Sequence, residues 1–421
     1  MFKKDIQYYR FCAYGFLKNL RFFEPFLIII LHHEGLSFTQ IGVLYAIREI
    51  FRNILEIPAG VFADAFGRRK SMLLAFSSYI ISFVVFFMAG SFVLFILAFL
   101  LYSVGDAFRT GTHKAMIFTH LELNSWEKQK VSYYGHTRSW SQTGSAISAL
   151  AAGLFILFTG EYKIIFLLSC LPYLLDLINL ATYPKSLDGI GREPGKRKYL
   201  NELITTFRNF TKAFKSYELR DTVLSISTYT GYYKAVKDFI QPMIQALAIS
   251  LPFLSVQSLE KRTAILVGII YFILFLLSSL AARKSGRILK LFPNSRQALN
   301  ITFAIGLALG LASGFFVHLN LLLPALVLFS GIYLVQNVRK PIGIGKVADH
   351  IDSKILASAL SAESQAETIF AAIFVLILGI FTDLLGLGIG ILILSLLVFL
   401  INLLLRTISR KERQFSNSLI P

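Results

Sequence analysis

Apolar stretches of about 20 residues recur along the whole chain, and they constrain its fold more than any other feature. Each is long enough to cross a hydrocarbon layer of roughly 30 Å as an α-helix. The composition agrees, since 55% of the residues are hydrophobic and only 16% are charged. We therefore predict an all-α integral membrane protein with about twelve transmembrane helices. The predicted spans are residues 10–32, 38–63, 71–90, 92–118, 133–158, 163–183, 222–248, 263–283, 297–317, 320–345, 356–382 and 386–406.

The basic residues lie mainly on one side of these spans. If the first span runs outward, the outer loops hold only Lys163, Lys261 and Arg262, and the inner loops hold most of the remaining Lys and Arg. This asymmetry follows the positive-inside rule. It accounts for most of the net charge of +18, which argues against a nucleic-acid partner. It also predicts a multi-pass protein of the plasma membrane or bacterial inner membrane, with both termini in the cytoplasm.

Signatures of a cofactor or of an enzyme are missing from the sequence. Cys12 and Cys170 fall inside apolar stretches, where a thiol acts as a small hydrophobe. No spacing of His, Cys and acidic residues resembles a metal site. No nucleophile elbow, P-loop or Walker motif is present, so we predict neither an enzyme nor an ATP-driven pump. We expect no cofactor and no bound metal.

A faint internal repeat divides the chain into two halves. Pro25 aligns with Pro242, and Arg109 aligns with Arg339, in the same order along the chain. A basic segment containing glycine and proline separates the halves. The predicted domains are an N-terminal six-helix bundle (1–183), a cytoplasmic basic linker (184–221), a C-terminal six-helix bundle (222–406) and a cytoplasmic tail (407–421).

The stretch "GVFADAFGRRK", between the second and third spans, carries a glycine, an acid and a basic cluster at fixed spacing. With the repeat and the basic linker, it resembles the major facilitator superfamily over nearly the whole chain. One departure is Ala65, where the family usually has a basic residue. The second-half copy has Arg283 in place of the acid. The resemblance implies two pseudo-symmetric six-helix bundles and a cytoplasmic latch, made in one transport state and broken in the other; its residues are Gly60, Asp64, Gly67, Arg68 and Arg69.

Gly67 permits a tight turn, and Asp64 is placed to accept hydrogen bonds from amides at the start of a neighbouring helix. Arg68 and Arg69 are placed to pair with acids across the interface between the halves. The alternative is that this cluster only fixes the topology.

Charged residues within the spans predict the functional site, because a charge in the hydrocarbon core costs roughly 2.5–3.5 kcal/mol. Some can neutralise each other within one helix: Arg21 with Glu24, Arg52 with Glu56, and Asp106 with Arg109. The charges concentrate on spans 1, 2, 4, 5, 7, 10 and 11, and the resemblance implies that spans 1, 4, 7 and 10 line a central cavity. We predict that the substrate-binding residues are Arg21, Arg109, His113, Gln142, Lys234, Lys237, Gln241, Asn337 and Arg339, and that the proton-coupling acids are Glu24, Glu49, Asp106 and Asp238.

Basic residues exceed acids in this predicted cavity, and a cationic cavity attracts anions. Arginine suits carboxylate and phosphate recognition in particular. We therefore predict a monomeric secondary active transporter that moves a hydrophilic organic anion or zwitterion by alternating access, driven by protons. The alternative is a proton-driven multidrug or metal-chelate (siderophore-type) exporter. The cavity of a drug exporter should be mainly apolar with one or two acids.

Overall fold

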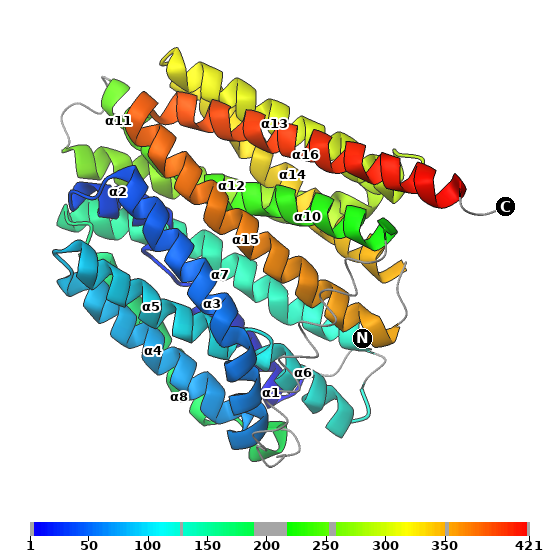
Figure 1. The fold of residues 1–421 in the computed structure, drawn as a ribbon. Helices are drawn as coiled ribbons and strands as arrows, with labels where there is room; N and C mark the ends of the chain where they lie inside the picture. Colours follow the sequence, from blue (N-terminus) through cyan, green and yellow to red (C-terminus); the bar gives the residue numbers. More distant parts are fainter. Residues whose placement is uncertain (1–3, 127–128, 189–216, 252–257, 350–352, 419–421) are drawn as a thin grey trace. The chain divides into compact units, whose positions relative to one another are not determined.

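The computed structural model describes residues 4–126, 129–188, 217–251, 258–349 and 353–418, and every regular element among them is a helix (Figure 1). The first half contains α1 (Ile6–Leu17), η1 (Glu24–Phe26), α2 (Leu27–His33), α3 (Phe38–Phe66), α4 (Arg68–Met88), α5 (Phe92–Arg109), α6 (Thr112–Leu123), α7 (Lys130–Thr159), α8 (Ile164–Ala181) and η3 (Lys185–Asp188). The second half contains α10 (Tyr217–Val236), η4 (Lys237–Phe239), α11 (Ile240–Ser250), α12 (Leu259–Leu289), α13 (Ser295–His318), α14 (Leu322–Asp349), α15 (Ser353–Leu385) and α16 (Leu387–Ser418).

Nine helices of the described part are long and apolar enough to cross a membrane. The other three predicted spans correspond to α1 with α2, to α3, and to α10 with α11, and each of these carries several charges. The all-helical membrane fold is confirmed, and the count of twelve spans stays a prediction. Most of the predicted linker, residues 189–216, lies outside the described residues, so the domain boundaries also stay predictions.

Three predicted spans are interrupted instead of continuous. The first breaks between α1 and η1, where Pro25 follows the break, and the seventh breaks at η4, just before Pro242. Proline lacks an N–H and disfavours a helical conformation in the residue before it. The fourth span breaks between α5 and α6 at Gly111, whose φ of +80° is readily adopted by glycine.

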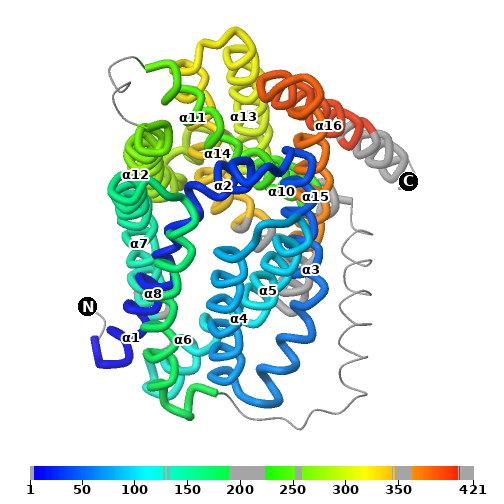
Figure 2. The backbone as a smooth tube through the Cα atoms, turned by 90° about the vertical axis from the view of Figure 1, so that its left-hand side faces the viewer, coloured from blue at the N-terminus to red at the C-terminus, as the bar shows by residue number. Residues whose placement is uncertain are grey.

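The chain forms two compact units, and both repeat the same packing pattern. Unit 1 is Met1–Gly35, Ile47–Tyr199 and Ala248–Phe275, and unit 2 is Leu36–Ala46, Leu200–Leu247 and Leu276–Pro421. In unit 1, α4 packs against α5 and α8, and α1 packs against α7 and α8 (Figure 2). In unit 2, α13 packs against α14 and α16, and α10 packs against α15 and α16. Helices at equivalent places in the sequence repeat thus make equivalent contacts, which confirms the pseudo-symmetric halves.

Aromatic residues fill the core of unit 1. Phe76, Tyr79, Phe83 and Tyr173 are fully buried between α4 and α8, and the centres of neighbouring rings lie 4.9–5.8 Å apart. Rings at these distances pack favourably edge to face or tilted. Leucine and isoleucine on the outer sides of α8 remain exposed, as expected for a surface that faces lipid. Tyr79 of this core also contacts the charged residues Asp106 and Arg109 on α5.

Candidate functional site

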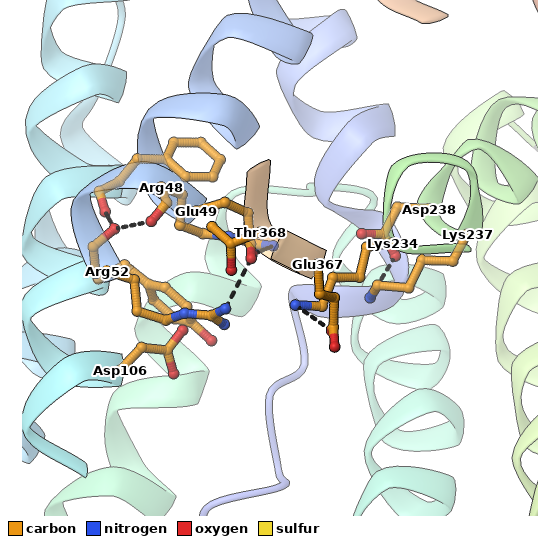
Figure 3. Close-up of polar contacts among 12 residues, drawn as sticks. Arg48, Glu49, Arg52, Asp106, Lys234, Lys237, Asp238, Glu367 and Thr368 are labelled. Carbon is orange, nitrogen blue, oxygen red and sulfur yellow. Dashed lines mark hydrogen bonds and ion pairs between the residues drawn. The ribbon is translucent and has the colours of Figure 1, made fainter. Parts of the chain in front are cut away.

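An arginine pair on α3 shares one buried carboxylate (Figure 3). Arg48 Nη2 lies 3.1 Å from Glu49 Oε1, and Arg52 Nη2 lies 2.9 Å from Glu49 Oε2. The Glu49 side chain is 7% exposed, whereas Arg48 and Arg52 keep 19% and 24%. Arg52 therefore pairs with Glu49 one turn earlier, and the predicted pairing with Glu56 is wrong, since Glu56 is exposed. This group of three side chains, the α3 triad, places two guanidinium groups against one carboxylate.

A second cluster joins α5 to α4. Arg109 Nη2 lies 3.1 Å from Asp106 Oδ1, which confirms the predicted pair. Tyr79 links both residues, because its hydroxyl donates to Asp106 Oδ1 at 2.5 Å and accepts from Arg109 Nε at 3.0 Å. The guanidinium of Arg109 is thus fixed by a carboxylate and a phenol within its own unit, and its side chain keeps 21% exposure.

The break in the first span carries a third pair. Arg21 Nη2 lies 3.0 Å from Glu24 Oε2, as predicted, and Arg21 Nη1 donates to the Tyr102 hydroxyl at 3.0 Å. Tyr173 donates to the backbone carbonyl of Lys18 at 2.9 Å, which supplies a partner where the helix is interrupted. The interruption is therefore a stable feature of unit 1, and it presents the Arg21–Glu24 pair beside Tyr102.

Unit 2 carries two further ion pairs around the break in the seventh span (Figure 3). Lys237 Nζ lies 3.1 Å from Asp238 Oδ1, and Lys234 Nζ lies 2.6 Å from Glu367 Oε1 on α15. Tyr333 donates to the carbonyl of Lys237 at 2.5 Å, so this break is supported as the one at Lys18 is. Pairing offsets part of the cost of placing these charges within membrane spans.

Arg339 occupies an aromatic pocket inside unit 2. The guanidinium lies 4.4 Å from the ring centre of Tyr229 and 5.3 Å from that of Phe303. It donates to the Leu299 carbonyl and, at 2.9 Å, to the Thr302 hydroxyl, both on α13. The side chain is buried, so Arg339 does not extend toward solvent as Lys340 beside it does.

Other predicted binding residues differ in exposure. The His113 ring is buried and stacks on Tyr14, with ring centres 3.5 Å apart, and its Nε2 lies 3.2 Å from the Tyr183 hydroxyl. Gln241 is fully buried, Asn337 donates to the Tyr333 carbonyl, and Gln142 is exposed on α7. The ion pairs bring Arg21, Arg109, Lys234 and Lys237 into charged clusters. His113 joins none of these pairs, but it lies near Arg109, and Gln142 lies apart on the exposed side of α7.

The predicted latch residues make contacts that the sequence did not indicate. Arg68 Nη1 donates to Thr119 Oγ1 at 2.7 Å, and Arg69 Nη1 donates to the Tyr183 carbonyl at 3.2 Å. These contacts tie the start of α4 to α6 and to the segment after α8, within unit 1. Asp64 and Gly60 lie exposed on α3. The carboxylate that receives an amide at this helix start is Asp188, which the sequence analysis missed.

The clusters also include residues that we did not assign to the site from the sequence. Arg48, Arg52 and Glu367 were among the charged residues within the spans, and their spacing gave the only signal. Tyr79 gave none, because tyrosines in apolar helices are usually packing residues. Among the described residues, no group of three His, Cys, Asp or Glu side chains is arranged to hold a metal ion.

The apolar helices and their repeated packing define a multi-pass membrane protein. The chain belongs to the Major Facilitator Superfamily, since the sequence model of that family matches residues 11–362. This confirms the resemblance seen in the sequence.

Two curated relatives are transporters by name. The uncharacterized MFS-type transporter YxaM of Bacillus subtilis (strain 168) is 32% identical over 104 residues, and the match covers 24% of this chain and only 26% of that protein. The sucrose permease of Escherichia coli is 24% identical over 304 residues, covering 64% of this chain and 71% of that protein.

Solved structures share the fold at low sequence identity. The nucleoside transporter NupG superimposes with a TM-score of 0.72 at 12% identity, covering 96% of this chain and 99% of NupG. A bacterial homolog of the human lysosomal transporter Spinster, inward-facing and unoccupied, gives a TM-score of 0.71 at 14% identity, covering 97% and 98% of the two chains. At such identities the likeness shows the fold alone.

Proposed function

We propose that this chain is a secondary active transporter for a hydrophilic organic anion or zwitterion bearing a carboxylate or phosphate, driven by protons. In this proposal both termini lie in the cytoplasm and the protein works as a monomer by alternating access. It is not an enzyme, which accords with its membership of a transporter family.

The α3 triad is the observation that supports an anionic substrate. Its ion pairs set two guanidinium groups against one carboxylate, so the three side chains together have a net positive charge. The side chains of Arg48 and Arg52 are 19% and 24% exposed, whereas the Glu49 side chain is buried. A substrate carboxylate or phosphate would balance this charge through charge-assisted hydrogen bonds, which are stronger than neutral ones. Arg48 and Arg52 thereby join the predicted binding residues.

Acids at two of the three interrupted spans, the first and the seventh, are the proposed proton-coupling groups. Glu24 pairs with Arg21 at the first break, and Asp238 pairs with Lys237 at the second. A carboxylate that gains a proton loses its ion pair, and a break in the helix allows such a change to alter the local backbone. Glu49 and Asp106 remain candidates for the same role.

Transport into proteoliposomes with an imposed pH gradient tests this function. The substrate panel contains dicarboxylates, phosphate esters, dipeptides, sucrose, nucleosides and lipophilic cations. We expect gradient-dependent movement of anions or zwitterions, and loss of that movement in Arg52→Gln but not in the exposed control Lys290→Gln. Movement of lipophilic cations alone would support the drug-exporter alternative instead.

A neutral sugar is a second candidate substrate, because the sucrose permease match covers 64% of this chain. Most charged side chains of the clusters are already paired within the protein. The hydroxyl groups of a sugar, which are neutral, would form hydrogen bonds with the exposed parts of these side chains. Movement of sucrose with Arg52→Gln still active would favour this candidate over an anion.

A further inference from the structure

An open cavity lies at the end of unit 1 where α1 begins and α6 ends. Its volume is ≈ 810 Å³, and it lies away from the ion-pair clusters of the spans. The walls come from residues 4–10, from the end of α6, and from the segment that leads into η3. By the predicted topology this end faces the cytoplasm, at the depth of the lipid headgroups.

A buried amide in this cavity is left without hydrogen bonds. Gln7 is 6% exposed, and neither its Nε2 nor its Oε1 has a hydrogen-bond partner among the described residues. A buried amide without partners is unfavourable, and native proteins rarely tolerate one without a reason. The Gln7 side chain lines the cavity, but both polar atoms of its amide are buried. A turn of this side chain toward the opening would bring the amide to a bound molecule that offers an acceptor and a donor.

Positive charge surrounds the same space. Lys4 and Arg10 line the cavity, and so does His120, whose Nε2 lies 3.0 Å from Asp5 Oδ2. Asp5 meanwhile caps α1 by accepting from the Tyr8 amide at 2.8 Å. The one acid in the wall is thus engaged by the protein, and the basic groups give the cavity a preference for an anion.

The rim of the cavity is apolar and exposed. Ile6 is 75% exposed, Tyr9 60% and Leu123 59%, and all three border the opening. A tyrosine and aliphatic side chains beside basic residues are typical of surfaces at a membrane interface. A ligand with an anionic head and an apolar tail would match both parts of the site.

We propose that this cavity binds an anionic phosphate group, and that the headgroup of an anionic phospholipid supplies it. Gln7 and Arg10 hold the phosphate oxygens, Lys4 contributes charge at the opening, and the acyl chains pass over the rim of Ile6, Tyr9 and Leu123. A soluble phosphate ester carries the same chemistry without the acyl chains, so the two sources are separable by experiment. This site is independent of the transported substrate.

Trp126 gives a direct readout, because its ring centre lies 5.9 Å from that of His120. The chain has two tryptophans, so Trp140→Phe leaves Trp126 as the only tryptophan emitter. The full-length protein with this change is placed in nanodiscs of phosphatidylcholine with increasing phosphatidylglycerol, and emission and melting temperature are followed. Glycerol phosphate and inorganic phosphate are titrated separately into protein in pure phosphatidylcholine.

We expect phosphatidylglycerol to change Trp126 emission and to raise the melting temperature. Gln7→Met removes the amide but keeps the size of the side chain. It should leave the melting temperature in pure phosphatidylcholine unchanged or higher, and weaken the phosphatidylglycerol response about tenfold or more. Lys4→Ala should weaken the response as well, and Lys290→Ala, a basic residue outside the cavity, should not.

The response to soluble phosphates identifies the source. A response to glycerol phosphate equal to that of phosphatidylglycerol would keep the phosphate site but assign it to a soluble ester. Equal phosphatidylglycerol responses in Gln7→Met, Lys4→Ala and the parent protein would overturn the site, and so would the absence of any response in the parent.

Discussion

The carboxylate of Asp188 accepts a hydrogen bond from the backbone N–H of Arg69, with 2.6 Å between Oδ1 and N. Arg69 is in the first turn of α4, where backbone N–H groups lack partners within the helix and the helix dipole favours a negative charge. A Cβ on Gly67 would lie 3.0 Å from the carboxyl carbon of Asp188, and the φ of Gly67 is +100°. Glycine is therefore required here for the turn and for the approach of this acid.

Asp188→Ala should lower the free energy of unfolding by about 0.5–2 kcal/mol, as the loss of a helix cap typically does. The expected readout is a lower melting temperature of the purified protein. Asp64→Asn serves as the control, because Asp64 is exposed on α3 and should leave the melting temperature unchanged. Equal shifts in the two variants would show that the hydrogen bond to Arg69 does not stabilise the fold.

Asp64→Asn tests the predicted latch by a different measurement. If the Asp64 carboxylate holds the cytoplasmic ends together in one state, its loss should shift the protein toward the inward-open state. Transport should then fall while substrate binding survives, and Asp64→Glu should restore part of the rate. If the transport rate is unchanged at normal expression, residues 60–70 only fix the topology of the chain and do not form a latch.

Much of the fold follows from the sequence, because the length of an apolar stretch and the presence of a proline each affect the helix in which they lie. The spans follow from the apolar stretches, and Pro25 and Pro242 mark two of the three breaks. Charge pairs one turn apart, such as Asp106 with Arg109 on α5, were also predictable, since residues three apart share a helix face.

Contacts between distant segments were not predictable in the same way. Asp188 lies 119 positions from Arg69, and nothing in the spacing indicates that the chain returns to the start of α4. Arg52 had acids within reach on both sides, and only the packed rotamer selects Glu49 over Glu56. The position of Arg339 depends on Tyr229 and Phe303, which come from two other helices.

Amide substitutions at the paired acids test proton coupling. We expect Asp238→Asn or Glu24→Gln to leave uptake independent of an imposed pH gradient, because the coupling acid can then no longer exchange a proton. Counterflow exchange of substrate, which needs no net proton movement, should continue. The exposed acid Glu161, changed to Gln, is the control. If these variants, together with Glu49→Gln and Asp106→Asn, all keep gradient-driven uptake, the coupling acid lies elsewhere or the carrier is a uniporter.

Arg339→Lys distinguishes a structural arginine from a substrate clamp. The sequence repeat predicts that Arg109 and Arg339 bind one anion from the two halves. The geometry gives Arg339 a different set of contacts, with Thr302 and the Leu299 carbonyl as acceptors and Tyr229 beneath the guanidinium. Lysine keeps the charge but lacks the planar fork, so it cannot reproduce both hydrogen bonds and the stacking together.

We therefore expect Arg339→Lys to lower the free energy of unfolding by about 1.5–3 kcal/mol, the usual size of hydrogen bonds to a charged group. The exposed neighbour, changed as Lys340→Arg, should leave it unaltered. Arg109→Lys should also destabilise the protein, because it disturbs the contacts with Asp106 and Tyr79. Unaltered melting temperatures in both lysine variants, combined with weaker substrate binding, would instead support the clamp. Normal stability, binding and transport in both would exclude the clamp and favour the drug-exporter alternative.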